Sequence, residues 1–332
     1  MKGPKKRSKS GRKRKNQADA LLASTIQGGE QAGTEVLLVR ARVARRRQKA
    51  ARLTRTRNVA AIQAGRLAIP ERTRSMLSLS ARTGTLMAEG DSWFDYPMHD
   101  VLSMLEDDYG YNVESVAHRG DRIEDMAYSG GQAEAFARRL EKLLRANEVP
   151  RAILLSGGGN DIAGDQFSLL LNHAASPLPA TNDDIVRGVI DVRMRDAYAH
   201  MISGLTTITK GYLDVPLPIV VHGYAHPVPD GRGFMGGWSL LPGPWLRPGF
   251  VSKGHVDQSL NTKVTATLID RFNNMMETLV SLPAFNHVHF VDLRTELRND
   301  GGYREHWANE LHPTKAGFKL VTAKLAARVA SL

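Results

Sequence analysis

Short apolar runs alternate with longer helical patterns from about residue 83 to the end of the chain. Runs of strand length without charges are typical of parallel strands covered on both faces. The expected strands are Thr85–Ala88, Val113–Ala117, Ala152–Leu155, Pro218–Val221 and Val288–Val291. The expected helices are Met98–Asp108, Asp121–Asn147 with a break at Ser129–Gly131, Asp184–Tyr212, Val256–Leu282 and Lys315–Ala330. This alternation predicts an α/β fold, a three-layer α/β/α sandwich around a five-stranded parallel sheet.

The charge of the chain divides it into two parts. Residues 1–75 contain 21 Lys/Arg and 4 Asp/Glu, whereas the remaining residues contain 24 Lys/Arg and 30 Asp/Glu. Such a shift in composition indicates a structural boundary. We therefore expect a basic N-terminal extension over residues 1–75 and an α/β domain over residues 76–332.

The extension itself has two sections. Met1–Gly33 has few large apolar residues and is predicted to be disordered. Glu35–Ala68 is predicted to form a basic amphipathic helix, because apolar residues recur at helical spacing among many arginines: Val36, Val39, Val43, Ala50 and Leu53. Two interpretations stay open: the helix packs on the domain, or the extension binds a polyanion such as nucleic acid or an anionic membrane surface.

Several kinds of chemistry leave no trace in the sequence. The chain has no cysteine, so disulfides and thiol catalysis are excluded. No apolar run is long enough for a membrane helix, and the basic start lacks the apolar segment of a secretory signal, so a cytoplasmic location is expected. Walker and dinucleotide-binding motifs are absent, and the spacing of Glu305, His306, Glu310 and His312 does not match a zinc motif. We expect neither a cofactor nor a metal.

Three polar segments lie where expected strands end or where the last helix begins. Gly90-Asp91-Ser92 follows the first strand, Gly157-Gly158-Gly159-Asn160 follows the third, and Asn309-Glu310-Leu311-His312 precedes the closing helix. The carboxyl ends of parallel strands share one edge of the sheet. The sequence therefore predicts that a serine, an asparagine and a histidine meet at that edge.

A serine near the start, an asparagine after a glycine run and a His-Pro near the end resemble the SGNH (GDSL-type) hydrolases. The resemblance implies a flavodoxin-like sheet with strand order 2-1-3-4-5. It implies that Ser92 is the nucleophile and His312 its general base. It also implies that the Ser92 N–H, the Gly120 N–H and the Asn160 amide stabilise the oxyanion.

The sequence departs from the pattern of that family at one position. The family usually has Asp three residues before the histidine, where this chain has Asn309. An amide can orient an imidazole but cannot stabilise imidazolium with charge. Glu310 or the more distant Asp292 could supply the carboxylate, with Glu310 favoured by its closeness in sequence, or Ser92 and His312 could act as a dyad.

Other residues are expected around this site. The long segment Ala225–Gly254 is rich in Pro and Gly and contains Trp238 and Trp245, which favours a wall or lid facing the substrate. Asp91 and Asp161 are expected to fix their own turns. Asp95 and Tyr96 are candidates for the lining of the pocket.

These observations favour a serine esterase that hydrolyses carboxylic O-acyl esters of a small molecule, glycan or lipid through a Ser-His acyl-enzyme mechanism. Two alternatives stay open. An acyltransferase would use the same serine, and a non-catalytic module would bind a ligand or polyanion on the same fold.

Overall fold

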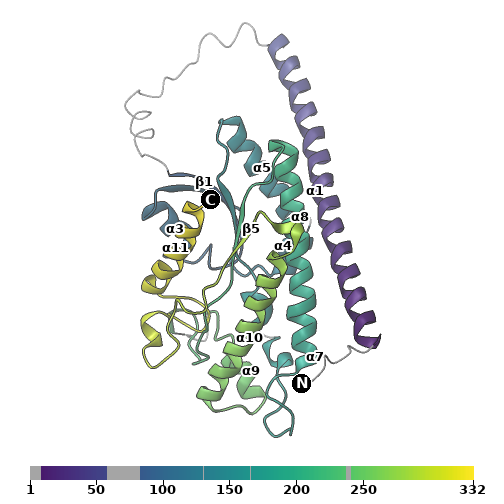
Figure 1. The fold of residues 1–332 in the computed structure, drawn as a ribbon. Coiled ribbons are helices and arrows are strands. Elements are labelled where there is room, and N and C mark those ends of the chain that lie inside the picture. Colours follow the sequence, from purple (N-terminus) through teal and green to yellow (C-terminus); the bar gives the residue numbers. More distant parts are fainter. Residues whose placement is uncertain (1–8, 58–82, 130, 165, 237–240) are drawn as a thin grey trace.

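The computed structural model describes residues 9–57 and 83–332, apart from 130, 165 and 237–240. A five-stranded parallel sheet has the order β2-β1-β3-β4-β5 (Figure 1). The strands are β1 (Gly84–Glu89), β2 (Tyr111–Ser115), β3 (Ala152–Leu155), β4 (Ile219–His222) and β5 (Val288–Val291). The predicted five-stranded α/β fold and strand order are confirmed. The boundary expected at residues 75 and 76 lies outside the described residues.

The burial of each strand follows its place in the sheet. Every residue of the central strands β3 and β4 is buried, in agreement with the apolar runs Ala152–Leu155 and Ile219–Val221. The edge strands β2 and β5 are partly exposed. In β1, Leu86 pairs with Val113 of β2 and with Ala152 of β3, so the strand that leads to Ser92 is held on both sides.

Helices cover both faces of the sheet (Figure 1). One face carries α3 (Val101–Asp107) and α11 (Lys315–Ala330). The other carries α4 (Ile123–Tyr128), α5 (Gln132–Arg145), α8 (Arg195–Leu213) and α10 (Gln258–Val280). The chain enters α8 through α7 (Asp183–Val186) and a π-helical segment, Arg187–Met194. Short helical elements are α6 (Gly159–Ile162), α9 (Arg247–Ser252), and single turns at Phe167–Leu170, Phe234–Gly236, Pro283–Phe285 and Tyr303–Glu305.

Side-chain caps explain where several helices begin. Asp100 and Ser103 form a capping box at α3. The Thr314 side chain accepts a hydrogen bond from the Gly317 N–H and so caps α11, which begins three residues after His312. The helix expected from Asp121 begins two residues later, as α4 after Arg122, and the Asp121 carboxylate accepts a hydrogen bond from Gln132.

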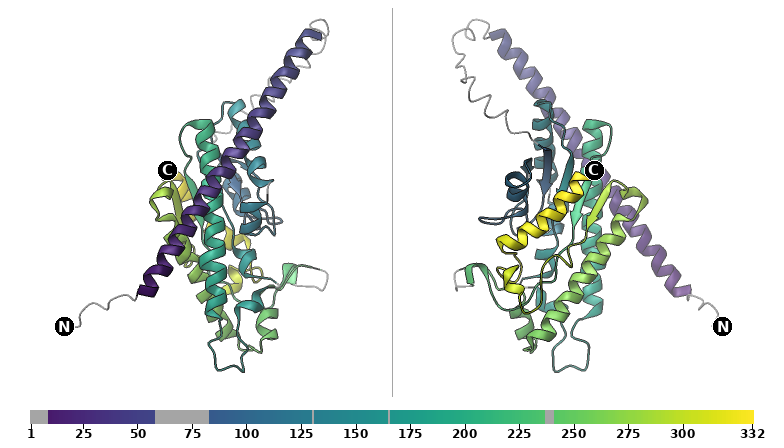
Figure 2. Two further views of the ribbon diagram at one scale, coloured as in Figure 1. Left: turned by 90° about the vertical axis from the view of Figure 1, so that its right-hand side faces the viewer. Right: turned by 60° about the vertical axis from the view of Figure 1, so that its left-hand side comes forward.

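The N-terminal section is more ordered than its composition suggested. Helix α1 spans Lys9–Arg57, so the prediction of disorder is wrong for Lys9–Gly33. It forms an additional layer outside α8, and both of its ends extend past the body (Figure 2). The expected helix over Glu35–Ala68 is observed as far as Arg57, and residues 58–68 lie outside the described residues.

The contact of α1 with the body combines small residues with part of the expected apolar stripe. Val36 packs against the core and Val39 is exposed, whereas Gly29 and Gly33 are buried against α8. A Cβ atom on Gly29 would lie 2.2 Å from the His200 carbonyl oxygen, and one on Gly33 would lie 2.6 Å from the Gly204 carbonyl oxygen. The two helix backbones therefore approach too closely for any side chain at these glycines. Glycines are poor helix formers, so composition alone favoured disorder there.

A buried ion pair fastens the same helix to α5. Arg40 is only 2% exposed, and its Nε donates to Glu141 Oε1 at 2.9 Å. The Tyr212 hydroxyl of α8 donates to the same carboxylate oxygen at 2.7 Å. Breaking a buried pair of this kind leaves an unpaired charge and typically costs several kcal/mol, about 3–5 kcal/mol. Of the two interpretations of the extension, packing on the body is the one the fold shows.

The glycine contact leads to a testable expectation. Gly33→Val should push α1 away from α8, because overpacking of this kind costs about 1–3 kcal/mol. We expect a lower melting temperature and faster trypsin cleavage within the Lys- and Arg-rich α1. The matched control is Gln31→Val, which places the same side chain at an exposed position of the same helix. Equal stability and equal cleavage of the two variants would contradict the packing described here.

Candidate active site

Ser92 lies in the turn that follows β1, and its position is fixed by a close approach to β3. A Cβ atom on Gly90 would lie 2.7 Å from the Ser156 carbonyl oxygen, so only glycine fits there. The Asp91 N–H donates to that same oxygen at 3.2 Å. The chain must turn directly at the end of the strand, which leaves Ser92 at the carboxyl edge of the sheet.

The buried Asp91 carboxylate joins three strand ends. Its Oδ1 accepts from the Ser156 hydroxyl at 2.7 Å and from the Trp93 N–H at 3.0 Å. Its Oδ2 accepts from the Tyr224 hydroxyl at 2.6 Å. These partners follow β3, β1 and β4, respectively. Asp91 fixes its own turn as expected, and also holds the serine turn against its neighbours.

The structure brings Ser92 and His312 together across 220 positions of sequence. The Ser92 Oγ lies 2.8 Å from His312 Nε2, and His312 Nδ1 lies 3.0 Å from Asn309 Oδ1. That Oδ1 also accepts from the backbone N–H groups of Leu311 and His312, so it is an acceptor. His312 Nδ1 therefore carries the proton, and the Nε2 lone pair faces the serine hydroxyl.

The imidazole is enclosed without a charged partner. His312 is 5% exposed, the Tyr96 ring stacks on it at 4.1 Å between centroids, and Trp245 meets it edge-on at 5.4 Å. Burial lowers the pKa of His312 to about 3, because the charged form is poorly solvated there. The histidine is therefore neutral over most of the pH range and is a weak base.

The expectation that Glu310 pairs with His312 is wrong. Its carboxylate is fully buried and accepts four backbone hydrogen bonds, from the N–H groups of Gly231, Trp245, Leu246 and Arg247 at 2.6–3.0 Å. Burial raises the pKa of Glu310, and the four amides oppose that shift. Glu310 therefore holds the two ends of the long loop together, and sequence alone gave no sign of these distant amides.

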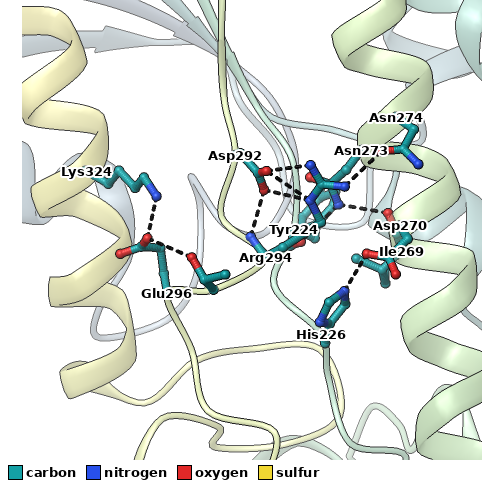
Figure 3. A network of polar contacts seen from close by, with 11 residues as sticks. Tyr224, His226, Ile269, Asp270, Asn273, Asn274, Asp292, Arg294, Glu296 and Lys324 are labelled. Atoms are coloured by element: carbon teal, nitrogen blue, oxygen red, sulfur yellow. Dashed lines mark hydrogen bonds and ion pairs between the residues drawn. The ribbon is translucent and has the colours of Figure 1, made fainter.

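Asp292 does not reach the histidine either. Figure 3 shows its carboxylate paired with Arg294, which also donates to Asn274 on α10. The hydrogen bonds from Arg294 lower the pKa of Asp292. Figure 3 shows a second pair nearby, His226 with Asp270 at 2.7 Å. The partner of the His312 Nδ1 is thus the Asn309 amide, not a carboxylate.

Gly120 and Asn160 lie close to the serine, and all three residues line one cavity. The Asn160 Nδ2 donates to the Asp121 carbonyl at 2.9 Å, and Asp161 Oδ2 accepts from the Ile123 N–H at 3.0 Å. These two bonds join the turn after β3 to the turn after β2, where Gly120 has a φ of +88°. Burial raises the pKa of Asp161 to about 7. The expectation that Asp161 fixes its own turn is wrong, because its carboxylate instead holds the start of α4.

Two cavities flank Ser92. The outer cavity, of about 420 Å³, contains Ser92, Gly120, Asn160 and His312 in its lining. Its walls include Tyr96, Phe234 and Trp245, so the long loop does form a wall as expected. Asp95 does not line either cavity and instead accepts from the Arg119 N–H at 3.1 Å.

The inner cavity is smaller, about 40 Å³, and almost wholly apolar. It is bounded by Ser92, Asn160, Tyr224, Ala225 and Leu246. Tyr224 and Leu246 were not among the site residues expected from the sequence. The position of Tyr224 directly after β4, at the edge where the other site residues lie, was the available signal.

The part of the chain that the structure describes contains no group of three or more His, Asp or Glu side chains placed to bind a metal ion. Among its helices, none is long and apolar enough to cross a membrane.

Comparison with solved structures finds esterases of low sequence identity. EstA, a psychrotrophic esterase from Pseudoalteromonas sp., is 14% identical with a TM-score of 0.36, and the match covers 75% of this chain and 97% of that chain. Est24, a carbohydrate acetylesterase from Sinorhizobium meliloti, is 13% identical with a TM-score of 0.39, covering 75% and 99%. Axe2, an acetylxylan esterase from Geobacillus stearothermophilus, is 13% identical with a TM-score of 0.33, covering 75% and 95%.

A search of curated proteins found no match. The model of the GDSL-like Lipase/Acylhydrolase family matches residues 78–320, which include all five strands and both Ser92 and His312. Because that match spans well over half of the sequence, the chain belongs to the GDSL-like lipase/acylhydrolase family and is a hydrolase that acts on esters.

Proposed function

We propose that this hydrolase cleaves small O-acyl esters through an acyl-enzyme on Ser92. The observation that carries the proposal is the 2.8 Å contact of the Ser92 Oγ with His312 Nε2, on an imidazole whose other nitrogen is held by Asn309. A serine hydroxyl needs such a base, because it is a weak nucleophile at neutral pH.

The proposed reaction has two steps. The Ser92 oxygen attacks the ester carbonyl while its proton passes to His312 Nε2, and the tetrahedral intermediate collapses as the imidazolium returns that proton to the leaving alcohol. A water molecule then attacks the acyl-serine, again losing its proton to His312, and the released Ser92 takes the proton back. The products are the free alcohol and the carboxylic acid.

Three donors are available for the oxyanion. Within the described residues, the backbone N–H groups of Ser92 and Gly120 donate to no protein atom. The Asn160 Nδ2 gives one hydrogen to the Asp121 carbonyl and keeps the second. All three residues line the outer cavity beside Ser92. Donors that are already oriented stabilise the charge as it develops, without reorganisation.

The two cavities support a short acyl group. A cavity needs about 10–15 Å³ to hold one water molecule, so the inner cavity of about 40 Å³ has room for only a few heavy atoms, as in an acetyl group. The outer cavity, with its aromatic walls, is large enough for a sugar or aryl alcohol.

The experiment that tests the proposal compares the native chain with Ser92→Ala. The native chain should hydrolyse p-nitrophenyl acetate much faster than p-nitrophenyl octanoate and react with a fluorophosphonate probe. Ser92→Ala should lose both properties, with a fall in kcat of about a thousandfold or more. The control is Ser259→Ala, at an exposed position. Undiminished turnover by Ser92→Ala would refute the proposal.

A second candidate is a module that binds a ligand without cleaving it. The observation that favours it is the neutral Asn309 beside a histidine with a pKa of about 3, because loss of the carboxylate in a triad can cost about ten-thousandfold in rate. In that case the native chain would neither react with the fluorophosphonate nor hydrolyse the acetate ester.

The role of Asn309 can be tested through pH dependence. The pKa of about 3 means that native His312 stays neutral, and able to accept a proton, down to acidic pH. Asn309→Asp would add a negative charge beside Nδ1 and raise that pKa. We expect the acid limb of kcat/KM to move to higher pH and kcat near neutral pH to rise at least tenfold. Identical pH profiles for both forms, with fluorescence showing both folded, would contradict this role.

Glu310 should act on the shape of the pocket rather than on the chemistry. Glu310→Gln leaves one oxygen for four amide donors, and each unsatisfied buried group costs about 1–3 kcal/mol. We expect a lower melting temperature and a severalfold rise in KM for an aryl ester, because Trp245 lines the outer cavity. The acid limb of kcat should stay where it is. A shift of that limb would mean that Glu310 acts on His312.

A further inference from the structure

A groove lined by cations lies between α1 and α5. Its volume is about 630 Å³, and it shares no lining residue with either cavity beside Ser92. Figure 1 shows the two helices next to each other, with the last part of α1 continuing past the body. Five cationic side chains line the groove: Arg47 from α1, and Arg138, Arg139, Lys142 and Arg145 from α5.

Acidic residues neutralise only part of this charge. Glu114 pairs with both Arg139 and Lys142, and Glu134 lies 3.6 Å from Arg138. Arg47 and Arg145 form no ion pair with any residue that the structure describes. The groove therefore keeps a positive excess.

The positive charge continues along α1 beyond the groove. Arg42, Arg45, Arg46 and Lys49 are exposed, and no acidic residue occurs in the sequence between Val36 and Arg57. Residues three and four apart on a helix lie about 5–6 Å from each other, so these cations form a row. We call the groove and this row together the basic surface.

The two walls of the groove are held in a fixed relation. Arg40, buried two residues before the first cation of the row, pairs with Glu141 of α5, and the Tyr212 hydroxyl donates to the same carboxylate. The close contact of Gly29 and Gly33 with α8 fixes the direction in which α1 runs toward the Arg40–Glu141 pair. The cations of the two helices are thus preorganised, which lowers the entropic cost of binding an anion.

The composition of the basic surface indicates the kind of anion. Among residues 41–50, Val43 is the largest apolar residue, and the groove adds only Val116 and Ala135. A helix that binds at a membrane surface inserts Leu, Phe or Trp side chains, and none is present in this stretch. A platform for stacking bases would need aromatic side chains, and the groove has none. Regularly spaced arginines without either feature suit a row of phosphates.

We propose that the basic surface binds the phosphate backbone of a nucleic acid, without reading its sequence. This inference is independent of ester hydrolysis at Ser92. The binding energy would come from phosphate contacts and counterion release, so affinity should fall steeply with salt.

The test uses the full chain and a fluorescein-labelled 20-bp DNA duplex, followed by anisotropy at 50–200 mM NaCl. We expect saturable binding, two unrelated sequences bound equally, and a slope of log K against log salt of about −3 to −5, as four or five phosphate contacts predict. The triple variant Arg46→Gln, Arg47→Gln, Lys49→Gln should bind at least tenfold more weakly, with a slope smaller by about 2–3.

A matched variant carries the same loss of charge elsewhere: Lys263→Gln, Lys315→Gln, Lys319→Gln, all at exposed positions of α10 and α11. It should bind the duplex as the native chain does. Equal weakening of the two triple variants would overturn the proposal, because the effect would then come from net charge alone. Failure to bind at 50 mM NaCl would overturn it too, as would binding to phosphatidylserine vesicles but not to the duplex.

Discussion

The buried carboxylate of Asp91 is the constraint on which the arrangement of the site depends. It accepts hydrogen bonds from groups that follow three different strands, among them the hydroxyls of Ser156 and Tyr224. Hydrogen bonds to a charged group are worth about 1.5–3 kcal/mol each, more than a neutral pair. The strand ends are therefore locked together at the point where Ser92 leaves the sheet. The serine that we propose as the nucleophile is therefore held in place by the fold itself.

The histidine beside it is oriented by neutral groups. Asn309 Oδ1 fixes the tautomer of His312, and the stacked Tyr96 ring fixes its plane. Neither group offsets the desolvation of an imidazolium, so the pKa falls to about 3. The carboxylate that could have offset it, on Glu310, is instead used for four backbone amides of the long loop. The His312 ring is therefore held in a fixed orientation, but its imidazole is a weaker base than it would be beside a carboxylate.

The same division between anchoring and function applies to α1. Its inner face, with Gly29, Gly33 and the buried Arg40, holds the helix on α8 and α5. Its outer face after Arg40 carries cations that contribute nothing to that packing. A solvated charged face is ordinary on a helix that packs only by its other side. The row is unusual because acidic residues are absent from it, so the field around this part of α1 has one sign.

The sequence alone predicted most of the fold, because strand burial and helix periodicity are local patterns. Ala152–Leu155 and Lys315–Ala330 were predicted to the residue, and the order of the strands followed from the resemblance. The sequence also predicted that Ser92, Asn160 and His312 lie at one edge of the sheet, because the carboxyl ends of parallel strands share that edge. The positions of these three residues along the chain, relative to the expected strands and the last helix, were sufficient for that prediction.

Tertiary structure decided what depends on atoms that are distant in sequence. Glycine-rich residues of α1 looked disordered because the backbone of α8, which stabilises them, lies far along the chain. Glu310 was expected to be the partner of His312 because the two residues are close in sequence. In the structure the Glu310 carboxylate instead accepts hydrogen bonds from the backbone N–H groups of residues 231 and 245–247. Proximity along the chain says which groups are available, but only packing decides which of them meet. The low pKa of His312 has the same origin, because burial is a property of the folded chain and not of the residue.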